Sequence, residues 1–149
     1  MDAIRNWLYI GRYRDTIYAT LLEAQGISAM LQLAEAVQQP GVESLYLQVE
    51  DGVPLVGELL RKGVDFVLDQ KHRSRKVLVA CGAGMSRSAA YVVAVLKEDE
   101  GLSLLEALRT VKHYHPETII HPVLWISLCK IYQEDVSWDH AMEVMDSME

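Results

Sequence analysis

An apolar run that leads through a glycine-rich turn into an apolar helix is the feature that most constrains the fold of this chain. The run is Val77–Ala80, and an unbroken apolar segment of this kind is typical of a central strand buried on both faces. Gly82 and Gly84 mark the turn, and residues 88–100 predict a helix that ends at Gly101. A buried strand followed directly by a helix favours an α/β fold, in which helices cover a sheet.

The segments on either side of this unit extend the α/β pattern. Short apolar segments predict further strands at residues 7–10, 27–33 and 45–49. Apolar periodicity and end signals predict the other helices, at residues 16–25, 54–68, 103–115, 122–134 and 137–148. We expect one domain over residues 1–149, with a core of about 5–133 and a short C-terminal helical extension of about 137–148.

Composition excludes several classes of protein. Half of the 149 residues are hydrophobic and 23% are charged, which is typical of a folded chain and not of a disordered one. The net charge of −7 argues against nucleic acid or an anionic membrane as a partner, because both would repel the chain. The apolar run 89–96 is too short to cross a bilayer, and the first residues lack the pattern of a signal peptide. Two cysteines cannot form a disulfide framework, so we expect a cytoplasmic protein.

The turn after the central strand has the features of an anion site. It lies at the carboxyl end of a strand and at the amino end of a helix, where unpaired N–H groups attract negative charge. Small residues at 82–84 allow the backbone N–H groups to form a nest for a phosphate-sized anion. Arg87 adds a planar fork of donors that matches two phosphate oxygens. Cys81 precedes the nest, where the same dipoles favour its thiolate, a nucleophile directed at phosphorus.

Residues 81–88, which read CGAGMSRS, resemble the phosphate loop of the cysteine-based protein phosphatases, and in particular its dual-specificity branch. Residues 7–11 and 26–33 are similar to the first two strands of that catalytic domain, and 115–128 to the segment that leads into its last helix. The resemblance covers about residues 5–133. It implies a protein-tyrosine-phosphatase-like fold with a small, mixed central sheet, and hydrolysis of phosphotyrosine and phosphoserine or phosphothreonine in proteins.

The resemblance also implies the roles of the site residues. Cys81 would be the nucleophile, Arg87 would bind the phosphate, and Ser88 would assist breakdown of the phosphocysteine. Asp51, on a loop that follows a predicted strand, would be the general acid, with Glu50 as its competitor and helix capping as its structural alternative. No cofactor or metal is expected, and phosphate, sulfate or vanadate should occupy the loop. The expected substrate-binding residues are Gly82, Ala83, Gly84, Met85, Ser86 and Arg87.

One residue departs from the family pattern. The family usually has a histidine immediately before the nucleophile, and this chain has Ala80. That histidine supports the reactive thiol, so its replacement predicts weaker activation of Cys81. His121 is expected to contact the loop or the rim of the pocket, and it is the first candidate for a side chain that fills the space beside Ala80. The alternative for His121 is a residue that only begins the helix at Pro122.

Other interpretations remain open at this stage. The domain could bind phosphorylated residues without turnover, or act on an RNA 5′-phosphate, a phosphoinositide or a phosphoglucan. His113, His115 and His121 with Cys81 could form a metal site or a cysteine protease, although their spacing fits no common zinc pattern. Cys129 is expected to be a buried apolar residue, with a disulfide to Cys81 as the alternative. The basic run 71–76 is expected to be a solvated turn, with a docking patch for an acidic partner as the alternative.

Overall fold

A computed structural model describes residues 1–146, so the expected end of the last helix at Met148 lies outside the described residues. One sheet has the strand order β1-β2-β5-β3-β4. β1 and β2 are antiparallel and the other neighbours are parallel, so the predicted α/β fold with a small mixed sheet is confirmed. The strands are β1 (Asp2–Arg5), β2 (Leu8–Arg12), β3 (Ile27–Gln32), β4 (Glu43–Tyr46) and β5 (Lys76–Cys81).

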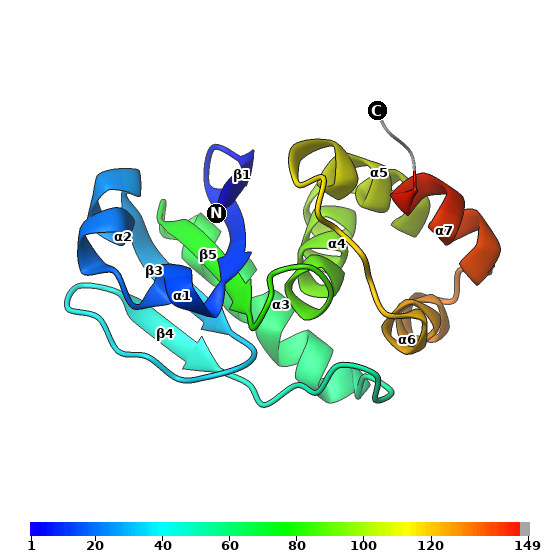
Figure 1. Cartoon of the computed structure of the whole chain (residues 1–149), viewed down its shortest axis with the longest axis horizontal. Helices are drawn as coiled ribbons and strands as arrows, with labels where there is room; N and C mark the ends of the chain where they lie inside the picture. Colours follow the sequence, from blue (N-terminus) through cyan, green and yellow to red (C-terminus); the bar gives the residue numbers. More distant parts are fainter. Residues whose placement is uncertain (147–149) are drawn as a thin grey trace.

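Strand β5 lies in the middle of the sheet, as its apolar sequence predicts (Figure 1). Val77–Ala80 is buried throughout, with no residue more than 2% exposed. Because side chains alternate along a strand, Val77 and Val79 enter the main core, whereas Leu78 and Ala80 enter a smaller cluster with Leu22. Cys81 therefore faces the main core and its neighbour Ala80 faces the opposite side of the sheet.

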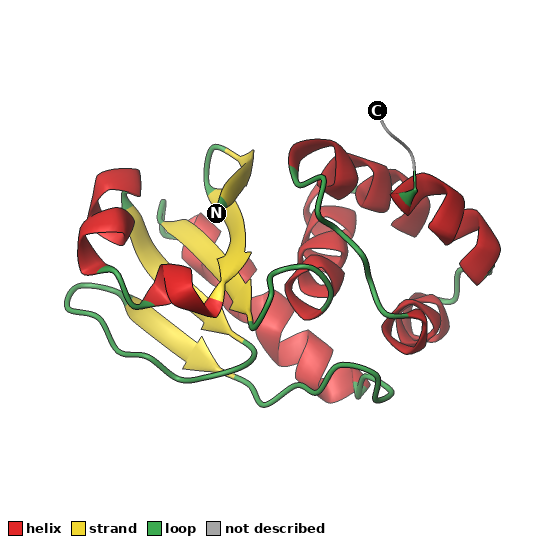
Figure 2. Cartoon of the chain, viewed as in Figure 1, coloured by secondary structure: helices red, strands yellow, loops and turns green. Residues whose placement is uncertain are grey.

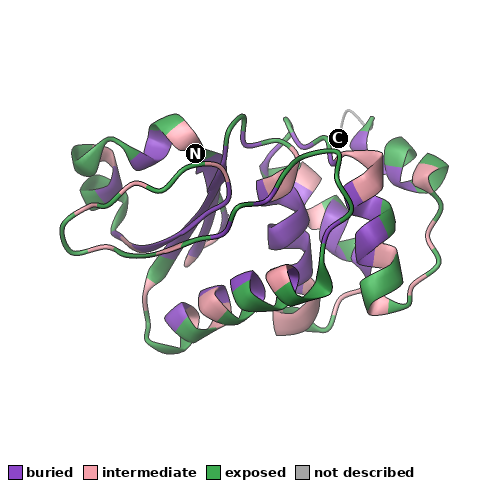
Figure 3. Cartoon of the chain, turned by 90° about the horizontal axis from the view of Figure 1, so that it is seen from below, coloured by how far each residue is buried: buried purple, intermediate pink, exposed green. Residues whose placement is uncertain are grey.

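Helices cover both faces of this sheet (Figures 1 and 2). The helices are α1 (Tyr13–Thr16), α2 (Ala19–Gln25), α3 (Gly57–His72), α4 (Arg87–Glu100), α5 (Leu104–Tyr114), α6 (Pro122–Tyr132) and α7 (Trp138–Met145). α1 and α2 lie on one face and α3 and α4 on the other, while α5, α6 and α7 form a helical layer beyond α4. Buried residues gather along the sheet and the inner sides of these helices (Figure 3). Within residues 1–146, no helix has the length and apolar character needed to span a bilayer.

The predicted helix ends agree with the structure where local chemistry sets them. Gly26 and Gly101 end α2 and α4 in the left-handed conformation, which glycine adopts without strain. Ser103 forms the predicted capping box with Glu106 at the start of α5. Ser137 caps α7 by accepting a hydrogen bond from the amide of His140. These glycines and serines end or begin a helix through contacts within one helical turn, so the helix ends can be predicted from the sequence.

Two predicted boundaries are wrong because distant contacts override them. The helix expected from Pro54 begins only at Gly57, because the amide of Leu55 donates to the Ser127 hydroxyl of α6 at 2.9 Å. The strand expected at 45–49 is β4, which ends at Tyr46; beyond it the chain keeps only two single hydrogen bonds to the end of β3. Neither β1 nor α1 was predicted from the sequence. The helix expected from residue 16 is α2, which begins at Ala19. β1 is a short edge strand whose pairing with β2 forms only in the folded sheet.

Candidate active site

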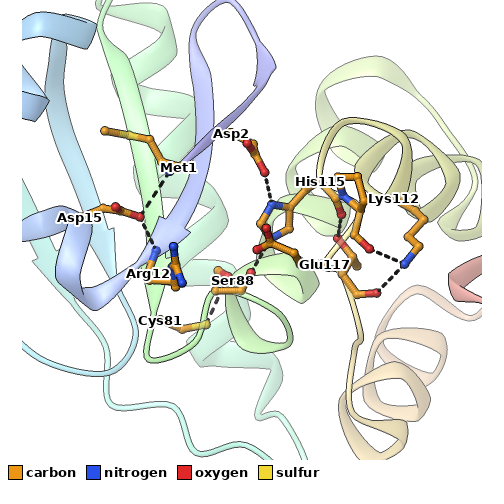
Figure 4. A network of polar contacts seen from close by, with 12 residues as sticks. Met1, Asp2, Arg12, Asp15, Cys81, Ser88, Lys112, His115 and Glu117 are labelled. Carbon is orange, nitrogen blue, oxygen red and sulfur yellow. Dashed lines mark hydrogen bonds and ion pairs between the residues drawn. The ribbon is translucent and has the colours of Figure 1, made fainter.

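The loop between β5 and α4 places Cys81 at the end of a buried strand and Arg87 at the start of a helix. Cys81 is only 2% exposed, yet it lines a surface cavity. Its sulfur is hydrogen-bonded to the hydroxyl of Ser88 at 3.2 Å, as Figure 4 shows. Ser88 lies fully buried beneath the thiol, in the first turn of α4. A hydroxyl at this distance can stabilise a thiolate by donating a hydrogen bond to the sulfur.

The backbone of this loop is available to an anion. Within residues 1–146, no amide from Gly82 to Arg87 donates a hydrogen bond to another protein group. Gly84 adopts φ +72°, and a Cβ atom there would lie 2.8 Å from the carbonyl oxygen of Gly11. Only glycine fits at this position, because both the conformation and the space exclude a side chain. The loop therefore has unpaired backbone amides, and its close approach to β2 at Gly84 constrains its backbone.

The guanidinium of Arg87 lies across the mouth of the loop. Its Nη1 donates to the carbonyl oxygen of Val49 at 2.9 Å. Its Nη2 lies near Gly82, where an added Cβ atom would be 3.1 Å away. One edge of the guanidinium is thus held by the segment that follows β4, and the other is directed at the loop. Arg87 ties the phosphate loop to the segment that carries Asp51.

Asp51 is held at the same cavity by a chain of hydrogen bonds. The hydroxyl of Ser86 donates to Oδ1 of Asp51 at 2.7 Å, and the amide of His121 donates to the Ser86 hydroxyl at 2.9 Å. Gly52 has φ +78° and lies against the His121 ring, which an added Cβ atom would approach to 3.3 Å. Glu50 lines a different depression. Of the two acidic candidates, the cavity contains Asp51.

The cavity has a volume of about 500 Å³ and brings together most of the predicted site. The predicted residues in its lining are Asp51, Cys81, Ala83, Met85, Ser86 and Arg87. Gly82 and Gly84 shape the loop without lining the cavity, and Ser88 supports Cys81 from below. A thiol, a guanidinium, a carboxyl group and unpaired amides thus surround one space, where the donors and the positive charge can stabilise a phosphate group.

The loop has a second support, formed by residues 115–121, which we call the bracing segment. The sequence indicated only His121 as a residue of this segment that contacts the loop. This segment connects α5 to α6 and runs beside the phosphate loop (Figure 1). His115 Nε2 contacts the carbonyl oxygen of Gly84 at 2.6 Å, and the amide of Ile119 donates to the carbonyl oxygen of Met85 at 3.0 Å. With the bond from His121 to Ser86, three consecutive loop residues are held from one side.

His115 is the buried anchor of this segment and is 3% exposed. Its Nδ1 contacts the carboxylate of Asp2 at 2.6 Å (Figure 4). Each ring nitrogen thus lies within hydrogen-bond distance of an oxygen, the carboxylate of Asp2 on one side and the carbonyl of Gly84 on the other. The ring thereby links β1 to the phosphate loop. No local sequence signal identifies this role, because Asp2 and Gly84 are distant from His115 in the chain.

The second cysteine lies apart from this chemistry, whereas His121 belongs to the cavity lining. His121 caps α6 by accepting from the amide of Val123, so it begins the helix and also borders the cavity, and it does not fill the space beside Ala80. Within residues 1–146, no group of three or more histidine, cysteine or acidic side chains is arranged to hold a metal ion. Cys129 lines a different depression from Cys81, and burial raises the pKa of its thiol.

The basic run 71–76 is largely neutralised within the molecule. Lys71 pairs with Asp99 at 2.7 Å, and Arg75 pairs with Glu43 at 2.9 Å. Arg73 lies 3.2 Å from the carboxylate of Asp69 one helical turn earlier. These contacts agree with the expected solvated turn and leave less charge for an acidic partner.

Comparison with known proteins identifies the family. Residues 8–134 match the model of the dual specificity phosphatase catalytic domain. The human dual specificity protein phosphatase 16 is 34% identical over 114 residues, which cover 73% of this chain and 17% of that protein. The protein-tyrosine-phosphatase IBR5 of Arabidopsis thaliana is 33% identical over 135 residues, covering 89% of this chain and 51% of that protein. The chain thus spans 17% of the length of the first of these curated relatives and about half of the second.

The fold agrees with this match. The crystal structure of human DUSP28 superposes with a TM-score of 0.84 at 26% identity, covering 89% of this chain and 96% of that one. The region matched by the family model includes strands β2 to β5, the phosphate loop and the bracing segment, whereas β1 precedes it and α7 follows it. The chain belongs to the family of dual-specificity phosphatase catalytic domains.

Proposed function

We propose that this chain hydrolyses phosphotyrosine, phosphoserine and phosphothreonine of proteins through a phosphocysteine intermediate. The observation that carries the proposal is the shared cavity of Cys81, Arg87 and Asp51. Residues 1–149 would serve as one catalytic domain. The substrate phosphate would occupy the loop, held by the guanidinium of Arg87 and by the unpaired amides.

In the first step the thiolate of Cys81 attacks phosphorus. A sulfur–phosphorus bond forms, and the bond from phosphorus to the leaving oxygen breaks. Asp51 gives its proton to that oxygen, which leaves as a hydroxyl group of the protein product. Arg87 and the loop amides stabilise the charge that develops on the phosphoryl oxygens.

In the second step water attacks phosphorus of the phosphocysteine. Asp51, now a carboxylate, accepts a proton from the water, and the sulfur–phosphorus bond breaks. Inorganic phosphate and the thiolate of Cys81 are released. The Ser88 hydroxyl, 3.2 Å from the sulfur, supports the proposal because it can donate to the departing thiolate.

The nucleophile is tested by the turnover of p-nitrophenyl phosphate by Cys81→Ser. This variant should lose turnover and still bind vanadate, because Arg87 and the loop amides remain. Cys129→Ser is the matched control and should keep the wild-type rate, since its thiol lies outside the cavity. Appreciable hydrolysis by Cys81→Ser would contradict the mechanism. Vanadate binding by a wild-type chain without turnover would instead indicate a module that only binds phosphorylated residues.

The phosphate ligand is tested by Arg87→Lys. A point charge cannot replace the planar fork or hold the carbonyl of Val49 in the same way, so vanadate binding and turnover should both fall sharply. An Arg87→Lys variant with near-normal activity would mean that the loop is not the phosphate site.

The general acid is tested by Asp51→Asn beside Glu50→Gln. We expect Asp51→Asn to lower turnover of phenyl phosphate, a poor leaving group, by about 100-fold, in line with the usual contribution of general acid catalysis. The alkaline limb of its rate–pH profile should flatten. Glu50→Gln should keep the wild-type rate, because its side chain lines another depression. The reverse result would assign the acid to Glu50.

The substrate class is tested with phosphoproteins and with other phosphate monoesters. Phosphotyrosine and phosphothreonine peptides should both release phosphate, at rates above those for an RNA 5′-phosphate, a phosphoinositide or a phosphoglucan. Faster release from one of these three would keep the mechanism and replace the proposed substrate.

A further inference from the structure

The cavity is larger than a phosphate group needs, and its remaining part is apolar. Its volume of about 500 Å³ lies within the range of about 300–1,000 Å³ that is usual for pockets that enclose a drug-sized ligand. The phosphate loop forms one end. Beyond it the cavity extends between the bracing segment and α7, and we call this extension the apolar annex. The hydrophobic side chains of the apolar annex are Met85, Ile119, Pro122, Trp138, Met142 and Met145.

Three of these large hydrophobic side chains are exposed to solvent. Ile119 is 59% exposed, Met142 is 42% exposed and Met85 is 38% exposed. They come from the bracing segment, from α7 and from the phosphate loop, and all line the same cavity. Apolar side chains that gather at a catalytic cavity, instead of being scattered singly, mark a binding surface. Methionine suits such a surface because its unbranched thioether adapts to groups of different shape.

The far wall of the apolar annex is fixed to the catalytic domain. Ala141 and Val144 of α7 are buried in the main core, and the amide of Ile120 donates to the sulfur of Met145 at 3.2 Å. The helix begins at Trp138, whereas the family match ends at residue 134. A helix outside the matched region therefore forms one side of a cavity whose other side is the phosphate loop.

We propose that the apolar annex binds a large hydrophobic side chain that flanks the phosphorylated residue of the substrate protein, and so sets substrate preference. The inference rests on the proposed function, because the substrate phosphate must occupy the loop for its neighbour to reach α7. One cavity contains both parts: its lining includes Arg87, at which the phosphate would bind, and Met85 and Met142 of the apolar annex. Burial of the flanking side chain would add binding energy in proportion to its apolar area.

Charge favours a peptide over a membrane lipid in this place. Among the described residues, Arg87 is the only lysine or arginine in the cavity lining, and Asp146 adds negative charge there. The whole chain carries a net charge of −7. A phosphate monoester in an anionic bilayer would present further negative charge to this surface, which would repel it. A peptide segment with uncharged apolar residues meets no such repulsion.

The test measures kcat/KM for a set of matched peptides. The parent peptide has phosphotyrosine flanked on both sides by three alanines, and each variant replaces one alanine with leucine. We expect leucine at one or more positions to raise kcat/KM by about tenfold in the wild-type chain, the usual effect of filling a hydrophobic subsite. Met142→Gln should reduce this ratio toward one, because it replaces the thioether with an amide while adding no charge.

Ile126→Gln is the matched control and should keep the wild-type ratio. Ile126 is 46% exposed, like Met142, and lies on α6 in a different depression. Because the readout is a ratio between two peptides on the same variant, a general loss of activity or folding cancels. A wild-type ratio near one at every position, or an unchanged ratio in Met142→Gln, would overturn the inference.

Two further outcomes separate this inference from the proposed function. If the wild-type chain hydrolyses p-nitrophenyl phosphate but no peptide, the proposed function fails and the inference fails with it. If all peptides are hydrolysed equally, only the inference fails. Phosphate release from phosphatidylcholine vesicles that contain phosphatidic acid is compared with release from the peptides. If the vesicles react faster, and Met142→Gln loses this advantage, the apolar annex binds an acyl chain and the inference of a peptide side chain is overturned.

Discussion

The two ends of the phosphate loop are supported in opposite ways. At the entry, Ala80 precedes Cys81 and packs among apolar side chains of β2, β3 and α2. At the exit, Gly84, Met85 and Ser86 receive hydrogen bonds from the bracing segment. The resemblance implied a histidine at the entry, where this chain has Ala80. The ring of His115, in the bracing segment, contacts the loop at its exit.

This difference indicates which contacts fix the conformation of the phosphate loop. Apolar contacts hold the entry but do not orient individual dipoles, since the hydrophobic effect has no direction. Hydrogen bonds at the exit fix the carbonyl groups of Gly84 and Met85, and so the peptide planes that carry the next amides. Positioning of the loop amides therefore depends on residues 115–121 more than on the residue before Cys81. The four predictions below test that asymmetry.

The largest effect is expected for Gly84→Ala, which disrupts the exit directly. The new Cβ atom would lie 2.8 Å from the backbone of Gly11, so the loop must move. Turnover of p-nitrophenyl phosphate should fall by about 100-fold, the usual result of displacing catalytic groups by about 1 Å. Gly41→Ala is the control: Gly41 has a similar φ of +73° but no atom within 4 Å of the added Cβ. If the Gly84→Ala variant were as active as Gly41→Ala, the conformation of the loop at its exit would not control turnover.

The second effect is expected for His115→Phe, which keeps a ring of similar shape and removes both hydrogen bonds. Leaving the buried carbonyl of Gly84 without a partner should cost about 1–3 kcal/mol of unfolding free energy. We also expect turnover to fall by about tenfold, since the loop loses one of its supports without a steric clash. Urea unfolding and kcat measure the two effects.

His113→Phe is the control for this substitution, because His113 is exposed and contacts Tyr114 edge to face. A double-mutant cycle with Asp2→Asn adds a second check. Asp2→Asn should cost much less in the His115→Phe background than in the wild type, since the partner ring is already changed. Strictly additive costs would mean that Asp2 and His115 act separately.

A smaller effect, on stability alone, is expected for Ala80→His at the entry. Ala80 is 2% exposed in an apolar cluster, so a larger and polar side chain should lower the unfolding free energy by about 1–3 kcal/mol. The control is Ala36→His, an exposed position where a change within about 0.5 kcal/mol is expected. A more stable and faster Ala80→His variant would show that the entry accepts the histidine of the family and would remove the asymmetry.

The smallest effect is expected for Tyr91→Phe in α4, the helix that follows the exit of the loop. Within residues 1–146 the buried Tyr91 hydroxyl has no hydrogen-bond partner, and burial raises its pKa. Its removal should leave turnover unchanged and raise the unfolding free energy by up to about 1 kcal/mol. Tyr132→Phe is the contrast, because that hydroxyl donates to Glu98 and its removal should destabilise. A clear loss of stability in Tyr91→Phe would reveal a partner for its hydroxyl.

The sequence by itself determined the unit from β5 to α4 and the ends of several helices. The apolar run, the glycines, Cys81 and Arg87 lie close together in the chain, so their arrangement follows from local backbone chemistry. Gly101 and Ser103 likewise act within one helical turn. The fold class could be predicted for the same reason, since alternation of strands and helices is a local pattern.

Only the tertiary structure decided which distant groups share the cavity. The choice of Asp51 over Glu50 depends on Ser86 and His121, and the start of α3 depends on a hydroxyl in α6. The contact from Asp2 through His115 to Gly84 joins three separate parts of the chain, and α7 closes the apolar annex from outside the family match. These hydrogen bonds and apolar contacts form only when the core has brought remote segments together, so no local pattern in the sequence encodes them.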